Sequence, residues 1–221
     1  MKKLLALLVL APLTAIGCHH GFRSEVQGSG KRERQKREVA AFTSISTDGA
    51  FFIDVVCQKD PSLEIEGDDN VLPLVTTEVS GNTLRIRNSK SYSVSEPITL
   101  KISVPNLEAL SVNGAGKFQV TNVNNEKFEI DSNGAAVINV SGTTKVIDID
   151  TNGAAKIDTH NLRASRGIVD SKGVSKVDLG VADQLDITVT GPSIVTYKGD
   201  PTVNKTIHGP GKVQKRADEG A

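Results

Sequence analysis

The sequence is poor in aromatic residues: it has no tryptophan, two tyrosines and six phenylalanines. A core built from this chain must rely on small and β-branched side chains, and few rings are available to stack on sugars or bases. An excess of charge is also missing, since 26 basic residues balance 26 acidic ones. Nucleic-acid binding usually shows as a strong basic excess, so we expect no nucleic-acid partner.

Recognisable catalytic motifs are absent as well. The 221 residues contain no G-x-S-x-G elbow, no Walker loop, no Cys–His pair apart from the adjacent Cys18 and His19, and no histidines at metal-ligand spacing. We therefore expect no catalytic residues and no cofactor, and the length allows one β domain of ordinary size or two small ones.

The first residues, MKKLLALLVLAPLTAIGC, form a secretory signal pattern. Two lysines precede an apolar stretch that is too short to span a membrane. Small residues before Cys18 suit cleavage between Gly17 and Cys18, so residues 1–17 are a predicted signal peptide. Removing them takes away Lys2 and Lys3 and leaves 24 basic against 26 acidic residues.

The segment ending at Cys18 resembles a bacterial lipobox, although Ala15 stands where leucine is commonest. The resemblance implies that Cys18 is acylated and anchors the protein to a membrane. His19 rather than aspartate follows it, which by resemblance to Gram-negative lipoproteins implies the outer membrane. The alternative is a soluble periplasmic or secreted protein with an unmodified Cys18, because Ala-x-Gly also suits an ordinary signal peptidase.

The second cysteine, Cys57, lies in FFIDVVCQ and shares strand parity with Ile53 and Val55. This pattern predicts a buried apolar thiol. A disulfide with Cys18, which would exclude lipidation, is the alternative.

Residues 18–40 show no apolar period and are rich in glycine, serine and charge. We expect a flexible basic linker here, with its KRERQKR run solvated or, alternatively, attracted to an anionic membrane. Residues 41–216 form the predicted folded domain, and residues 217–221 a disordered tail. Near the start of the domain, DDNVLPLVTTEV is expected to hold one short helix with Asp68 or Asp69 as its N-cap.

A repeat emerges when the chain is aligned on certain glycines. The segments LSVNGAGKFQV, FEIDSNGAAVINV, IDIDTNGAAKIDT, GIVDSKGVSKVDL, LDITVTGPSIVTY and KTIHGPGKVQK follow one another in steps of 18 to 20 residues. STDGAFFIDV, at Gly49, is a diverged first copy. The reference glycines, which we expect at structural turns, are Gly114, Gly134, Gly153, Gly173, Gly191 and Gly209.

Each repeat has the two-residue period of a β-strand on both sides of its glycine. Apolar residues lie four positions before the glycine in the first five copies and four positions after it in all six, and a small residue follows two positions after it. Such a unit cannot bury its apolar face alone, whereas stacked coils can. A hairpin meander does not explain identical environments every 19 residues or so. The sequence therefore predicts an all-β right-handed parallel β-helix, with a less regular N-terminal part.

Stacking would also align polar residues. Asp131, Asp150 and Asp170 lie three positions before their glycines, and the lysines Lys117, Lys156, Lys176 and Lys212 lie three positions after theirs. The aspartates are candidates for a calcium site or for the acidic groups of a polysaccharide-cleaving enzyme. Calcium sites normally converge several oxygens on one ion, whereas a straight ladder offers one per rung. We therefore expect a solvated face and no metal.

With these motifs in view, the chain resembles the head-GIN domain family, exported bacterial proteins labelled as auto-transporter adhesins. The resemblance covers about residues 41–214 and depends on ISVPNLEALSVNGAGKF and on the coils NGAAVINV, NGAAKIDT and KGVSKVDL. It implies a β-helical fold and an envelope location. It implies no known ligand and supplies no catalytic residue.

Three function classes follow. The first is a lipid-anchored envelope module that binds a glycan, an envelope polymer or a protein. The second is a self-associating structural scaffold of the envelope. The third is a carbohydrate-active β-helix enzyme, which the equivalent carboxylates and the scarcity of aromatic walls disfavour.

Overall fold

The computed structural model describes residues 25–217, and this part of the chain is all-β apart from one short 3-10 helix. Cys18, the predicted signal peptide and most of the predicted tail lie outside the described residues. Among residues 25–217, no helix has the length and hydropathy needed to cross a bilayer. The elements, in chain order, are β1 (Val26–Gln27), β2 (Arg32–Arg37), β3 (Ser44–Cys57), β4 (Ser62–Asp68), η1 (Leu72–Leu74), β5 (Val75–Ser80), β6 (Thr83–Asn88), β7 (Tyr92–Ser93), β8 (Thr99–Val104), β9 (Ala109–Gly153), β10 (Lys156–Gly173), β11 (Lys176–Thr190), β12 (Ile194–Lys198), β13 (Thr202–His208) and β14 (Lys212–Lys215).

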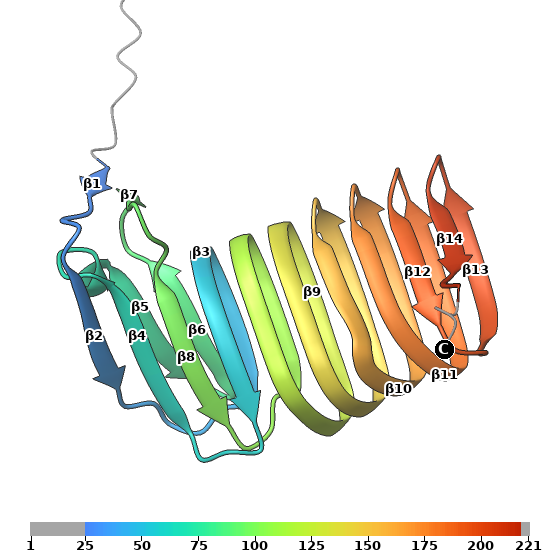
Figure 1. Ribbon diagram of the computed structural model, residues 1–221, viewed down its shortest axis with the longest axis horizontal. Helices are drawn as coiled ribbons and strands as arrows, with labels where there is room; N and C mark the ends of the chain where they lie inside the picture. Colours follow the sequence, from blue (N-terminus) through green and yellow to red (C-terminus); the bar gives the residue numbers. More distant parts are fainter. Residues whose placement is uncertain (1–24, 218–221) are drawn as a thin grey trace, which may run out of the picture.

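β3 and the strands from β9 to β14 form successive passes of the chain that pair in parallel. β3 pairs with β9, β9 with β10, β10 with β11, and β11 with both β12 and β13. Ile157 lies opposite Ile138 on one side and opposite Val177 on the other. The chain thus returns to the same edge about every 19 residues, as the repeat predicts. Figure 1 shows the passes side by side along the long axis, with β2 and β4 at one end and β13 and β14 at the other.

The N-terminal part contains antiparallel pairs, so the large sheet is mixed rather than wholly parallel. β4 lies between β2 and β8 and pairs antiparallel with both, and β5 pairs antiparallel with β6. Residues 81 and 82 alone connect β5 to β6. A two-residue connection can join only antiparallel neighbours. The large sheet keeps two open edges, at β2 and at the C-terminal strands.

The core is a set of apolar columns that run along the stack, as the sequence period predicts. Ile138, Ile157, Val177 and Val195, each four positions after a reference glycine, are fully buried. The column four positions before the glycines is buried as well: Leu110, Ile130, Ile149, Val169 and Ile187. Gly49 lies opposite Gly114, which confirms that STDGAFFIDV is the first copy of the repeat.

The prediction of a flexible linker is wrong for residues 32–37. This stretch forms β2, which pairs along its whole length with β4. The reason is complementary charge across the two strands, since Arg34 lies opposite Glu66 and Lys36 opposite Glu64.

The predicted short helix is present only as the 3-10 helix η1, and its N-cap is Val71 rather than Asp68 or Asp69. Asp68 instead ends β4, where its buried carboxylate accepts a hydrogen bond from the Gly30 amide at 2.9 Å.

Candidate functional site

The reference glycines form one column along the edge where the coils turn, which we call the glycine ridge. Each has a positive φ, from +96° at Gly191 to +155° at Gly134. A methyl group at Gly173 would lie 2.5 Å from the carbonyl oxygen of Gly153, and one at Gly134 would lie 2.0 Å from that of Gly114. The positive φ favours glycine at every ridge position, and close stacking against the preceding coil adds a second requirement at Gly114, Gly134, Gly153 and Gly173. The members are Gly49, Gly114, Gly134, Gly153, Gly173, Gly191 and Gly209.

Buried hydroxyl groups secure the ridge from the inside. The Ser193 hydroxyl donates to the carbonyl oxygen of Gly173 at 3.0 Å and accepts from the amide of Ser175 at the same distance. The Ser175 hydroxyl lies 3.0 Å from that of Thr151. Because these side chains connect neighbouring coils, they hold the backbone of the ridge in place, and with it the outward residues on either side.

One flank of the ridge is acidic. Asp150 lies directly opposite Asp170 in the next coil. With Asp131, Glu129 and Asp148, Asp150 lines an open groove of about 520 Å³, whose other lining residues are Ile130, Asn133, Asn152 and Lys172. We call this surface the acidic flank and include in it the nearby Glu126 and the rung residue Asp170.

Lysines neutralise much of the acidic flank. Lys172 lies 2.9 Å from the Asp170 carboxylate, and Lys127 bridges Glu129 at 2.5 Å and Asp148 at 3.1 Å. Burial raises the pKa of Asp150; the positive charge of Lys172 opposes this shift, and the charges of Asp170, Asp131 and Asp148 add to it.

The predicted calcium candidates Asp131, Asp150 and Asp170 share one face but do not converge on a point. Among residues 25–217, no three acidic, histidine or cysteine side chains are arranged to hold a metal ion. Neighbouring rungs are about 4.8 Å apart, which is close to the separation of the two carboxylates in retaining glycosidases. However, the residues that line the groove include no aromatic side chain against which a sugar ring could stack.

A second polar group ties the C-terminal end to the stack. The Arg216 guanidinium donates to the carboxylate of the buried Asp178 at 2.6 Å, and the Arg216 amide donates to the Tyr197 carbonyl oxygen. In the preceding coil, the imidazole of His160 contacts the Asp158 carboxylate. Burial acts to raise the pKa of Asp158, but the hydrogen bonds from His160 and the nearby positive charge of Arg216 together outweigh it and hold that pKa below its usual range.

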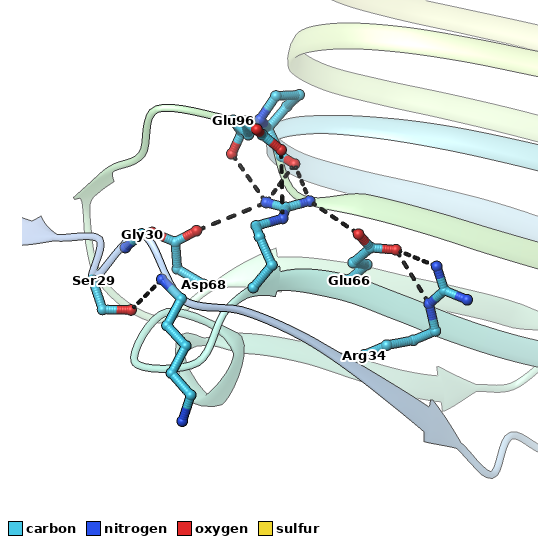
Figure 2. Close-up of polar contacts among 9 residues, drawn as sticks. Ser29, Gly30, Arg34, Glu66, Asp68 and Glu96 are labelled. Carbon is cyan, nitrogen blue, oxygen red and sulfur yellow. Dashed lines mark hydrogen bonds and ion pairs between the residues drawn. The ribbon is translucent and has the colours of Figure 1, made fainter.

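Sequence reasoning missed the charged cluster that holds β2 to the sheet. Figure 2 shows the Arg34 guanidinium against Glu66. The closest atoms of this pair are 2.7 Å apart. The Arg32 guanidinium lies within 3.8 Å of the carboxylates of Glu66, Asp68 and Glu96. Arg32 also donates to the carbonyl oxygens of Glu96 and Pro97. These contacts tie β2 to β4 and to the segment at Glu96 and Pro97. The signal that could have found it is the pairing of RERQKR with the acidic strand LEIEGD.

Both the sequence and the fold of this chain are similar to those of known proteins. Residues 41–201 match the family model described as "Putative auto-transporter adhesin, head GIN domain". The structure is similar to that of a putative adhesin from Bacteroides fragilis, with a TM-score of 0.69 and 24% identity over 86% of this chain and 100% of that one. It is also similar to a putative lipid binding protein from Parabacteroides distasonis, with a TM-score of 0.53 and 21% identity over 88% of this chain and 100% of that one. No curated protein matches the chain.

Proposed function

The chain belongs to the head GIN domain family, and we propose that it is a non-catalytic binding module of the bacterial cell envelope. The observation that carries this proposal is the register of the stack. Asp150 faces Asp170 and Lys156 faces Lys176, so outward charges of one sign recur in neighbouring coils. Repetition favours many weak, equivalent contacts with an extended partner such as a glycan, an envelope polymer or a protein. Catalysis needs different groups that converge on one point.

We propose further that the parallel passes form a right-handed β-helix. The return of the chain about every 19 residues and the column of corner glycines support this architecture. Crossover connections between parallel strands are almost always right-handed, because twisted strands pack back onto their sheet only in that sense. A crystal structure in which the coils wind to the left would contradict it.

For the anchor, the proposal is acylation of Cys18 after cleavage at Gly17, with display from the outer membrane. The lipobox-like segment before Cys18 supports it. Mass spectrometry of the mature N-terminus should find acyl chains on Cys18, and Cys18→Ser should release the protein or block its processing. An unmodified mature N-terminus would leave the soluble periplasmic or secreted alternative.

The binding function is tested by a screen of the mature protein against envelope glycans, peptidoglycan fragments, lipids and envelope proteins. Lipids are included because one structural neighbour is described as a lipid binding protein. We expect a salt-dependent interaction with at least one component, because the outward columns carry charge. A screen without any binding would contradict the proposal.

A carbohydrate-active enzyme is the second candidate function, and one observation favours it. The raised pKa of Asp150 beside a second carboxylate is a feature of acid–base sites. Turnover of a polysaccharide by the mature protein, lost in Asp150→Asn, would support this candidate.

A further inference from the structure

The flank of the ridge opposite the acidic flank carries lysines that, unlike those of the acidic flank, form no ion pairs among the described residues. Lys117, Lys156, Lys176 and Lys212 point outward three positions after their glycines, and all are exposed. Within the described residues 25–217, none of the four takes part in an ion pair. On the acidic flank, by contrast, Lys127, Lys145 and Lys172 are each paired with a carboxylate.

Two of these lysines face each other directly, since Lys156 lies opposite Lys176 in the parallel register. Neighbouring strands are about 4.8 Å apart, and like charges directly opposite one another are destabilising. The nearest carboxylates along these two strands are already engaged, because Asp158 contacts His160 and Asp178 binds Arg216. An external anion bound between Lys156 and Lys176 would therefore reduce the repulsion between their charges, which no carboxylate of these strands offsets.

Apolar side chains flank the lysine pair in the same column. Val137 lies opposite Lys156 on one side, and Ile194 lies opposite Lys176 on the other; each is 38% exposed. On the ridge beside them, Val174 is 64% exposed, the largest fraction among the exposed large apolar residues of the described chain. Four successive coils thus present the order Val137, Lys156, Lys176 and Ile194, which we call the basic–apolar strip.

From this arrangement we infer that the basic–apolar strip docks on an anionic lipid surface. Lipid phosphates complement the unpaired lysines, and the apolar side chains reach the boundary between headgroups and acyl chains. A soluble anionic polymer would satisfy Lys156 and Lys176 but would leave Val137, Val174 and Ile194 in water. Because the strip is narrow, the contact is weak, reversible and sensitive to salt.

This inference rests on the proposed binding function and names its partner class. A partner found only among glycans or proteins in the wider screen would overturn the inference and leave the binding function standing. Polysaccharide turnover by a protein that still binds vesicles would overturn the function and leave the inference standing.

The test is co-sedimentation of residues 19–221, which include every described residue, with phosphatidylcholine vesicles with and without phosphatidylglycerol. We expect binding only to the anionic vesicles and its loss at about 1 M salt, where the Debye length is about 3 Å. The double substitution Lys156→Gln and Lys176→Gln should weaken binding roughly 25-fold, at about fivefold per lysine near an anionic surface. The matched control, Lys127→Gln with Lys145→Gln, removes the same charge from the acidic flank and should bind like the parent.

A second pair of variants separates lipid from soluble polymer. Val174→Ser with Ile194→Ser should weaken vesicle binding severalfold and leave binding to dextran sulfate unchanged. Absence of vesicle binding, an equal loss in the control, or vesicle binding that ignores the serine substitutions would each overturn the inference. The last of these outcomes would assign the lysines to a soluble anionic polymer.

Discussion

At the residue scale, a corner glycine such as Gly173 satisfies two demands that no other residue meets together. The φ of Gly173 is +104°, and an added methyl group would lie 2.5 Å from the Gly153 carbonyl oxygen. Strained backbone of this kind costs about 1–3 kcal/mol, and the clash adds to that. We predict that Gly173→Ala lowers the free energy of unfolding by at least about 3 kcal/mol in chemical denaturation, since both effects apply.

Gly81 is the matched control. Its φ is +60°, but nothing lies within 4 Å of the position that a methyl group would take. Gly81→Ala should therefore cost only the conformational term, about 1–2 kcal/mol. Equal losses in the two variants would mean that close stacking at the ridge is not what requires glycine.

Asp150 gives a prediction about pH. Its pKa is raised in the folded protein, chiefly by burial, so the fold carries a penalty whenever this carboxylate is ionised. The penalty is complete above the folded pKa and disappears as the pH falls through that value toward the unfolded one. Asp150→Asn should thus stabilise the protein at neutral pH and remove this part of the pH dependence on the acidic side.

Asp186 should behave in the opposite way. Hydrogen bonds from Asn204, Arg166 and Gln184 lower its pKa, so Asp186→Asn should destabilise the protein at neutral pH. That loss should fade as the pH falls through the folded pKa of Asp186. Thermal unfolding of both variants from neutral to acid pH checks the two signs, and a stabilised Asp186→Asn would contradict the account.

Residue patterns in the sequence predicted which side chains are buried better than they predicted which groups the polar side chains bind. Strand parity alone indicates that Cys57 is buried, and the structure confirms it; burial raises the pKa of the thiol to about 11. The contacts of Arg32 could not be predicted, because they reach backbone carbonyls of Glu96 and Pro97 more than 60 positions away in the sequence. Nothing in the basic run itself indicates which distant groups the fold brings to it.

At the scale of elements, both ends of the stack carry charge where an open strand edge could recruit another chain. β2 has four basic residues among its six. At the other end, Lys205 of β13 lies opposite the buried Ile187, in the column that holds apolar residues in every preceding coil. Lys205 itself is exposed, and a charge in place of an apolar residue on an edge strand is a known protection against edge-to-edge association. This arrangement disfavours the self-associating scaffold.

We predict that Lys205→Ile causes concentration-dependent association, because it completes the apolar column at an unpaired edge. Sedimentation velocity at increasing protein concentration measures this effect. Thr206→Ile, an exposed neighbour in the same strand that lies opposite Thr188, is the control and should stay like the parent. End-to-end chains of the unmodified protein would contradict this reading and favour the scaffold.

The strands from β9 onward could be predicted because each copy of the repeat places the same kinds of residue at the same positions of a coil. Gly114, Gly134, Gly153, Gly173, Gly191 and Gly209 fix the register from sequence alone. The antiparallel strands β4, β5 and β6 lie in a stretch without that repeat, and their pairing depends on local turns such as residues 81–82. β2 was missed because charged, alternating residues are as typical of a solvated segment as of an edge strand.

At the scale of the whole molecule, stacking divides the outer surface into an acidic flank and a basic–apolar strip on either side of one ridge. Three lysines pair with four of the six carboxylates of the acidic flank, whereas Lys156 and Lys176 have no ion-pair partner among the described residues. Neither surface gathers a nucleophile, a base and an oxyanion site around one point. Both are instead extended along the direction in which the coils repeat.

The central claim is therefore that the protein binds an envelope component and does not transform it. The most direct measurement incubates the mature protein with the component that the screen identifies and follows the retained amount and the chain length or mass of that component over time. The account predicts that the component is retained by the protein and recovered chemically unchanged. Release of shortened or altered product by the parent protein, abolished in Asp150→Asn with its fold intact, would contradict the account.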